Sequence, residues 1–278
     1  RKLYALRDVT ATVESLPLIC ASILSKKIAE GIDALVLDVK TGNGAFMARE
    51  EDARALADAL VGLAERSGLR VAALLTQMDV PLGRTVGNAL EVRECIDVLR
   101  GGGPSDLVEL SVELAALMLW LGQGRPTLDA SRDAVRGALA DGSGLAMFRA
   151  IVARQGGDVG MVDDPSTLPQ APVCEMFVAP RAGHVARYDA GLIGRAAVHL
   201  GAGRAKAEDA VDPAVGFDIV APPGTRVDAG EPLIAIHART RAGVAAVRPM
   251  LDQALTMADE PPAPRPLILD RLGLARSS

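Results

Sequence analysis

The stretch ALVLDVKTGNG at residues 34–44 decides the fold of this chain. It is an apolar run of strand length that ends in a polar loop with two glycines. A pattern of helical period follows over residues 50–66, and a second apolar run, VAALL, occupies residues 71–75. Strands that alternate with helices predict a parallel α/β sheet. Because ligands bind beyond the carboxyl ends of such strands, we expect residues 40–46 and 76–83 to lie near any site.

The first 30 residues predict a turn followed by a helix. Ser15 suits the N-cap position, Pro17 suits the first helical turn, and Gly31 suits the end of the helix. So short a segment buries little of its own apolar face, so we expect Leu18, Ile19 and Leu24 to need a partner surface.

Further helices are predicted beyond the second apolar run. Residues 88–99 form one, and residues 104–157 form three more, broken at residues 122–124 and 141–142. We therefore expect helices to dominate the middle of the chain.

The character of the sequence changes near residue 168, where proline, glycine and short β-prone runs become frequent. These runs lie at residues 182–185, 217–220 and 232–237, and a closing helix is expected near residues 242–257. The proline-rich tail after Glu260 is expected to lie over the surface. The prediction is thus an α/β fold with a small helical segment and a C-terminal α+β domain, with domain bounds at 1–30, 31–167 and 168–278.

The composition of the chain limits the classes of function that it can have. The 278 residues include 49% hydrophobic and 23% charged residues, which is typical of about two globular domains. A formal charge of -5 argues against a nucleic-acid partner or an anionic membrane surface. No apolar run reaches the roughly 18 residues that a membrane span needs. The chain begins with Arg1, so we expect a processed, trimmed or fragmentary chain.

Cysteine usage indicates the compartment and the metal chemistry. Cys20, Cys95 and Cys174 are odd in number and widely spaced, which argues against a disulfide framework or a zinc site. We therefore expect a reducing cytoplasm as the location and no metal site.

One helix face carries a chemically useful set of side chains. Ser22 and Lys26 are four residues apart and share a face, with Ile19 and Ile23 beside them, while Arg7 could fold over it. Such a face suits a planar, uncharged, hydrogen-bonding ring. If the ring leaves as an anion, a nearby cation stabilises the transition state more than the ground state.

Spacing alone also permits a simpler interpretation of that face. The helix could be merely amphipathic, with Lys26 and Lys27 directed to water.

A family resemblance favours the ring-binding interpretation. It is carried by KLYALRDVTATVES at 2–15, ASILSKK at 21–27, DVKTGNGAF at 38–46, PLG at 81–83, GNALEV at 87–92 and GAGR at 201–204. In these blocks the chain resembles the thymidine and pyrimidine-nucleoside phosphorylases, over nearly its whole length and in the order of the family. The C-terminal domain is accordingly expected to resemble the small barrel-like or hammerhead domain of that family.

The resemblance implies an activity and a set of site residues. Phosphate attacks C1′ of thymidine, deoxyuridine or uridine and yields the free base and a pentose 1-phosphate, so a pyrimidine nucleoside and phosphate are the expected ligands. Arg7 and Lys26 are the implied catalytic residues, and Ser22 binds the pyrimidine with them. The remaining positions that line the base pocket are Tyr4, Ile19, Ile23 and Phe46. No cofactor is implied, since phosphate is the co-substrate, and a homodimer with a helical contact is expected.

The phosphate half of the family's site is missing. That half uses a Lys-His-Ser motif and a glycine-rich loop upstream of the first block, so we expect this chain alone to be inactive. We expect a missing N-terminal segment of the same enzyme to be the partner that completes it. His184, His199 and His237 do not match the family's catalytic histidine, and we expect each to be a structural or a surface histidine.

Two weaker matches have competing interpretations. Leu82, Thr85 and Glu94 match positions that hold potassium in some relatives, although Thr85 departs from the expected alanine, and an ordinary helix start is the preferred interpretation. The Gly201–Arg204 stretch could cradle a phosphate, but a tight turn is the simpler prediction.

Two rival functions stay open at the level of sequence. One is an enzyme similar to anthranilate phosphoribosyltransferase, which would need a diphosphate-binding loop and an acidic metal site. The other is a non-catalytic fragment that binds a base or only dimerises. The preference for deoxyribose or ribose is not encoded in any residue discussed above.

Overall fold

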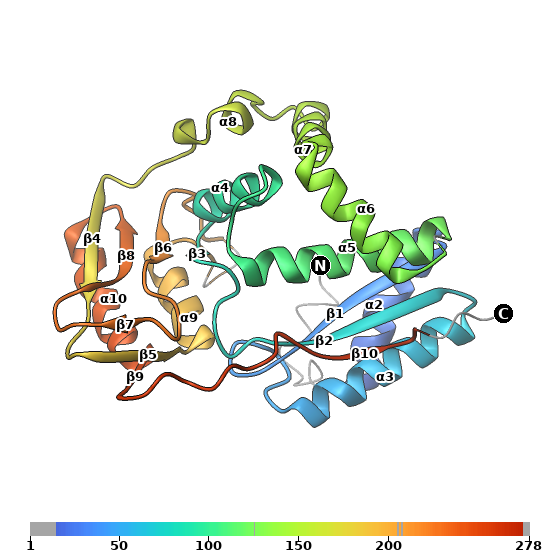
Figure 1. The fold of residues 1–278 in the computed structure, drawn as a ribbon, viewed down its shortest axis with the longest axis horizontal. Coiled ribbons are helices and arrows are strands. Elements are labelled where there is room, and N and C mark those ends of the chain that lie inside the picture. The colour runs from blue at the N-terminus through green and yellow to red at the C-terminus, as the bar shows by residue number, and fades with distance from the viewer. Residues whose placement is uncertain (1–14, 125, 205, 207, 275–278) are drawn as a thin grey trace.

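The structure is a computed structural model that describes residues 15–274, except residues 125, 205 and 207. Figure 1 shows an α/β part and a strand-rich C-terminal part, joined by a run of helices. The elements of the α/β part are α2 (Leu16–Ala29), β1 (Ala34–Thr41), α3 (Glu50–Arg66), β2 (Arg70–Gln77) and β10 (Ile268–Leu272). The helical run comprises α4 (Asn88–Leu99), α5 (Ser105–Gln123), α6 (Leu128–Ala140), α7 (Ser143–Arg154), α8 (Gly160–Asp163) and the 3-10 helix η1 (Pro165–Thr167).

The predicted parallel sheet is confirmed. β1 and β2 pair in parallel, with Leu35 opposite Val71 and Lys40 opposite Thr76, and α3 connects them. Side chains on the two faces of the sheet pack into two different apolar clusters. Leu35 and side chains of β2 pack with α3, whereas Leu74 and its neighbours pack with Trp120 and other residues of α5. A helix therefore covers each face, as buried parallel strands require.

The N-terminal helix packs on its own chain. Cys20 and Leu24 of α2 are buried in the cluster of α3, β1 and β2, and Ile19 packs against that cluster. The prediction that Leu24 needs a partner surface is wrong, because α3 supplies that surface. Leu18 is 43% exposed and Ile28 is 47% exposed, so α2 keeps apolar surface on its outer side.

The predicted helix breaks of the middle region are confirmed. α5 ends at Gly124 in the left-handed region with φ 64°, and α6 ends before Gly142, which has φ 76°. Both glycines supply a backbone conformation that other residues adopt at a cost.

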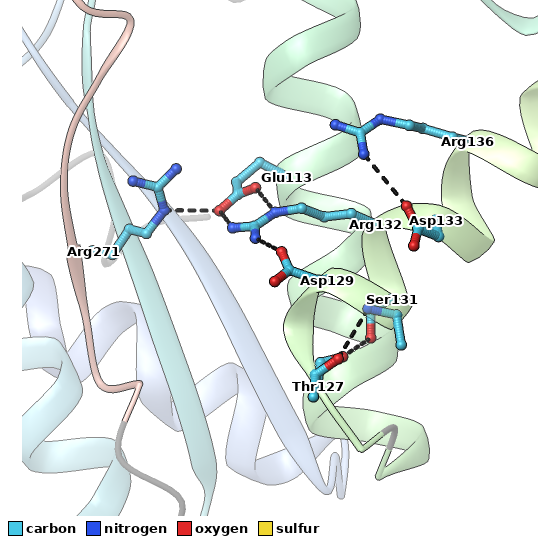
Figure 2. Close-up of polar contacts among 9 residues, drawn as sticks. Glu113, Thr127, Asp129, Ser131, Arg132, Asp133, Arg136 and Arg271 are labelled. Carbon is cyan, nitrogen blue, oxygen red and sulfur yellow. Dashed lines mark hydrogen bonds and ion pairs between the residues drawn. The ribbon is translucent and has the colours of Figure 1, made fainter.

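An ion cluster around the buried carboxylate of Glu113 joins this helical run to the end of the chain (Figure 2). Glu113 of α5 accepts two hydrogen bonds of 2.7 Å from Arg132 of α6 and one of 2.8 Å from Arg271 of β10. Asp129 adds a 2.6 Å contact to Arg132. A single carboxylate thus connects two helices and a sheet strand.

The C-terminal part contains two small antiparallel sheets within the described residues. Its elements are β4 (Val173–Val178), β5 (Gly183–Tyr188), α9 (Ala190–Leu200), β6 (Gly216–Ile219), β7 (Arg226–Val227), β8 (Pro232–Ala238), α10 (Arg241–Ala254) and β9 (Leu255–Ala258). One sheet has the order β3-β6-β8-β4, where β3 is Thr85–Val86, and the other has the order β7-β5-β9. The core holds Tyr188, Phe217, Ile236 and Leu251, with α9 and α10 packed against the strands.

Two short strands cross the predicted boundary at residue 168. β3 joins the C-terminal sheet, and β10 pairs antiparallel with β2 in the α/β sheet. The prediction that the tail after Glu260 lies over the surface is therefore wrong for β10, because the exposed edge of β2 offers it backbone partners. The closing helix also ends earlier than predicted, at Ala254, because the next residues pair with β5.

Among the described residues, no single helix is both long and apolar enough to cross a membrane; the bent pair α5 and α6 meets that test only when taken together.

Candidate functional site

The helix face predicted to bind the base is formed by α2. Ser22 and Lys26 lie one turn apart on this helix, and each makes an interaction within the protein. Lys26 and Lys27 occupy the last turn, where the helix dipole favours cations. Lys27 pairs with Glu30, with 2.9 Å between Nζ and Oε2, and so has a separate structural role. The predicted i, i+4 geometry is confirmed, whereas contact with a base stays a prediction.

Ile19 and Ile23 of the predicted pocket pack against the same apolar cluster as the loop after β1. Ile19 and Ile23 are half-buried and pack against the cluster of α2, α3, β1 and β2. Met47 of the loop packs against the same cluster, and Phe46 beside it is 59% exposed. An exposed aromatic ring next to an anchored residue is available for stacking.

Two of the predicted site residues, Tyr4 and Arg7, lie outside the described residues. The convergence of Arg7 with Ser22 and Lys26 beside Phe46 therefore stays a prediction.

A polar cluster lies where the two parallel strands end. Lys40 Nζ is 2.6 Å from Asp38 Oδ2 and 3.4 Å from Thr76 Oγ1. The Thr76 hydroxyl donates to Asp38 Oδ1 at 2.5 Å. The charge of Lys40 is thus matched by a carboxylate on its own strand.

The glycines of the loop at residues 42–46 allow a close approach to the segment that follows β2. Gly42 has φ 123°, and a Cβ atom there would lie 2.8 Å from Asp79 Oδ1. The Gly44 N–H donates to the Met78 carbonyl at 3.0 Å. Side chains larger than hydrogen would push the two segments apart.

Glu94 of α4 holds the segment that precedes its own helix. Its carboxylate accepts hydrogen bonds from the Arg84 N–H at 2.7 Å and from the Thr85 hydroxyl at 3.0 Å. Burial raises the pKa of Glu94 above its usual value. Within the described part of the chain, no group of three or more His, Cys, Asp or Glu side chains could hold a metal ion.

Two clefts lie elsewhere in the described part of the chain. A cleft of about 730 Å³ near α4 and the start of α5 is lined by three arginines and three acidic residues, namely Arg84, Arg93, Arg100, Glu94, Asp97 and Asp218. An apolar cleft of about 620 Å³ lies between α4, α5, α6 and α7. Ser22, Lys26 and Phe46 line neither of them. The balanced charges of the first cleft favour no single class of ligand.

The histidines lie on separate elements of the C-terminal part. His184 is on β5, His199 is in the last turn of α9, and His237 is on β8. Burial lowers the pKa of His237, which keeps it neutral near pH 7.

The glycine-rich stretch before Arg204 is a helix end. Gly201 has φ 104° and follows the last residue of α9, and the Ala202 N–H donates to the Ala197 carbonyl at 3.0 Å. The tight-turn prediction is therefore confirmed.

The sequence analysis missed some polar residues next to the predicted site. Asp189 and Asp79 both contact the loop at residues 42–46, although they lie far along the chain from it. Asp189 precedes α9, and an aspartate before an apolar helical pattern is the signal that could have marked it as an N-cap. Its second contact, with Asn43, depends on the tertiary fold.

Comparison with known proteins matches two families. Residues 1–145 match the family described as "Glycosyl transferase family, a/b domain", and residues 184–258 match "Pyrimidine nucleoside phosphorylase C-terminal domain". A pyrimidine-nucleoside phosphorylase of Geobacillus stearothermophilus is 46% identical over 272 residues, which cover 98% of this chain and 63% of that protein. A pyrimidine-nucleoside phosphorylase of Staphylococcus aureus strain USA300 is 46% identical over 264 residues, covering 95% and 61%. The chain thus spans about three-fifths of the length of these relatives.

Proposed function

Because the chain belongs to the glycosyl transferase family, in its pyrimidine-nucleoside phosphorylase branch, we propose that it is the base-binding part of a pentosyltransferase. The substrates are a pyrimidine nucleoside and phosphate, and the products are the free base and a pentose 1-phosphate. The observation that carries the proposal is the 46% identity to a pyrimidine-nucleoside phosphorylase over 98% of the chain. This match favours a phosphorylase over an enzyme similar to anthranilate phosphoribosyltransferase.

In the proposed mechanism, α2 and the loop after β1 hold the base. Ser22 and Lys26 address its polar edge together with Arg7, and the exposed ring of Phe46 covers one face. As phosphate attacks C1′, the bond to the base breaks and negative charge develops on the pyrimidine. Lys26 and Arg7 stabilise that charge, which is larger in the transition state than in the bound nucleoside.

The phosphate half of the site comes from an upstream segment in this proposal. Phosphate near neutral pH needs several N–H groups, hydroxyls and a cation arranged together. Lys40 lies next to the end of β1, and its 2.6 Å contact with Asp38 already pairs its charge. We therefore expect the isolated chain to show no phosphorolysis and to need no cofactor when completed.

We also propose a homodimer through exposed apolar side chains of α2. Leu18 and Ile28 are the large apolar side chains that α2 leaves exposed among the described residues. A contact that covers these two side chains would remove them from water. Sedimentation of the protein at micromolar concentration tests the proposal, and a monomer would contradict it.

The cytoplasm is the proposed location. Cys20, Cys95 and Cys174 are all free thiols in the structure, which is the usual state in a reducing compartment. Fractionation of the producing cells tests this point, and recovery of the protein outside the cytoplasm would contradict it.

The decisive experiment is a thymine-release assay on the chain alone and on the chain supplied with its upstream segment. We expect phosphate-dependent release only from the second. In that completed protein, Lys26→Ala should lower kcat about 100-fold, the cost of losing one transition-state contact. Lys27→Ala is the matched control, because Lys27 pairs with Glu30, and it should leave kcat unchanged. Release by the isolated chain would show that the phosphate site lies within it.

A further inference from the structure

The loop at residues 42–46 is held from two directions. On one side it contacts the segment after β2, where the Asn43 N–H donates to Asp79 Oδ1 at 3.2 Å. On the other side it contacts the start of α9, which belongs to the C-terminal part. The Ala190 N–H donates to the Asp79 carbonyl at 3.2 Å, so the three segments form one junction.

Asp189 is the centre of this junction. Its Oδ1 atom caps α9 by accepting a hydrogen bond of 2.8 Å from the Leu192 N–H. Its Oδ2 atom accepts one of 2.9 Å from the side-chain amide of Asn43, 146 residues away in sequence. One carboxylate therefore fixes both where α9 begins and where the loop lies. A charged acceptor makes these bonds stronger than bonds between neutral groups.

The amide of Asn43 has one favourable orientation. Its Nδ2 atom faces the carboxylate of Asp189, and its Oδ1 atom is buried without a hydrogen-bond partner among the described residues. Turning the amide over would place two oxygens against each other. The contact with Asp189 therefore determines the rotamer of Asn43.

Packing at the junction leaves no room for adjustment. A Cβ atom on Gly44 would lie 2.8 Å from the Cβ atom of Ala190. A Cβ atom on Gly191 would lie 2.7 Å from the Asn43 carbonyl oxygen. The loop and the helix start are in direct contact on both sides, so a shift of one moves the other.

We propose that Asp189 is a positioning residue for the base pocket. It acts through Asn43: it holds that side chain, and through it sets the place of Phe46, three residues further along the loop. The C-terminal part thereby shapes the pocket that α2 and the loop form. The expected effect on base binding rests on the proposed function. The contacts between the loop and α9 do not depend on that function.

A swap of the two side chains tests the proposal in the protein that includes the upstream segment. D189N leaves an oxygen to cap α9. The Asn43 amide then either faces another NH₂ group or turns over, which buries its own NH₂ group where the described residues offer Oδ1 no partner. N43D sets two carboxylates at contact distance. The double variant N43D/D189N restores a donor and an acceptor with their roles exchanged. We expect each single variant to raise KM for thymidine about tenfold, the cost of one hydrogen bond to a charged group, with a smaller change in kcat. The double variant should recover most of the loss.

A matched control separates positioning from stability. Asp212 also lies in the C-terminal part, accepts a backbone hydrogen bond from the Ala214 N–H at 3.1 Å and pairs with Arg239. D212N should lower Tm but leave KM unchanged. If D189N leaves KM unchanged, or if the effects of N43D and D189N simply add, the proposal is overturned.

Hydrogen exchange gives a readout that does not depend on catalysis. The Gly44 N–H should exchange faster in each single variant and return toward the original rate in the double variant. If the unaltered completed protein releases no thymine, the proposed function fails, and this exchange pattern then decides the junction by itself. Unchanged exchange in D189N overturns the inference.

Discussion

Glu94 on α4 and Glu113 on α5 are buried to a similar degree in neighbouring helices, with exposed fractions of 8% and 5%. Their surroundings differ. Glu94 accepts hydrogen bonds from a backbone N–H and a hydroxyl, whereas Glu113 lies between the guanidinium groups of Arg132 and Arg271. Burial raises the pKa of Glu94, while the hydrogen bonds from Arg132 lower the pKa of Glu113.

This difference shows that burial alone does not decide the state of a carboxyl group. Desolvation disfavours the charged form at both positions, and only the paired cations at Glu113 reverse it. Glu94 therefore organises a loop through neutral donors, and Glu113 joins distant elements through charge. Removing or neutralising each carboxyl group tests this contrast.

The largest effect is expected from Glu113→Ala. The variant leaves Arg132 and Arg271 without their shared carboxylate. Breaking a fully buried pair costs about 3–5 kcal/mol in the free energy of unfolding. Because the side chains of Arg132 and Arg271 are 23% and 38% exposed, we expect a loss at the lower end of that range. Urea denaturation measures the loss. Asp129→Ala is the control, because Asp129 also pairs with Arg132 but its side chain is 86% exposed. That control should cost at most about 1 kcal/mol. Equal losses in the two variants would contradict a special role for Glu113.

A smaller effect is expected from Glu113→Gln. The amide keeps one oxygen for a guanidinium group but directs its NH₂ group at the other, so we expect a loss of about 2 kcal/mol. The same substitution at Glu94 keeps the acceptor for the Arg84 N–H and removes a charge that burial disfavours. Glu94→Gln should therefore cost less than about 1 kcal/mol. A larger loss at Glu94 than at Glu113 in the same urea series would reverse the comparison.

The two glutamates should also give opposite pH dependence. The lowered pKa of Glu113 contributes stability that is present above the usual glutamate pKa and is lost as pH falls through the folded value. The raised pKa of Glu94 contributes stability that is present below the usual value and is lost as pH rises through the folded value. Stability curves of Glu113→Gln and Glu94→Gln, subtracted from that of the unaltered protein, should slope in opposite directions. Parallel curves would refute the assignment.

The smallest effect is expected from Lys27→Ala. Lys27 and Glu30 form an i, i+3 pair on the surface of α2, and such pairs contribute about 0.2–0.5 kcal/mol. The change in the free energy of unfolding should stay within that range and should shrink as salt is added. If Lys27→Ala lowered the free energy of unfolding as much as Glu113→Gln, the exposed Lys27–Glu30 pair and the pairs of the buried Glu113 would contribute alike, which would contradict the comparison.

The local parts of the fold and the site were predictable because short-range patterns encode them. The apolar run at residues 34–39 predicts β1, and the bounds of α3 and α4 agree with the predicted ranges 50–66 and 88–99. The i, i+4 spacing of Ser22 and Lys26 follows from helical geometry alone. Each of these features depends on residues within about two helical turns of one another.

Features that depend on distant pairing were missed. The tail after Glu260 has no strong strand pattern, yet residues 268–272 become β10 because β2 presents an unpaired edge. α9 was likewise not predicted as an element, and its N-cap Asp189 therefore had no assigned role. In the same way, the first 30 residues taken alone do not predict that Leu24 packs against α3.

By itself, the sequence determined the family, the succession of strands and helices, and the face of α2 that carries Ser22 and Lys26, since motifs and periodicity are local properties of the chain. Only the tertiary structure decided which distant polar side chains contact one another. Arg271 reaches Glu113 across 158 residues, and Asn43 reaches Asp189 across 146. Such contacts form only after the apolar clusters have packed, because burial brings the partners together and makes an unpaired charge costly.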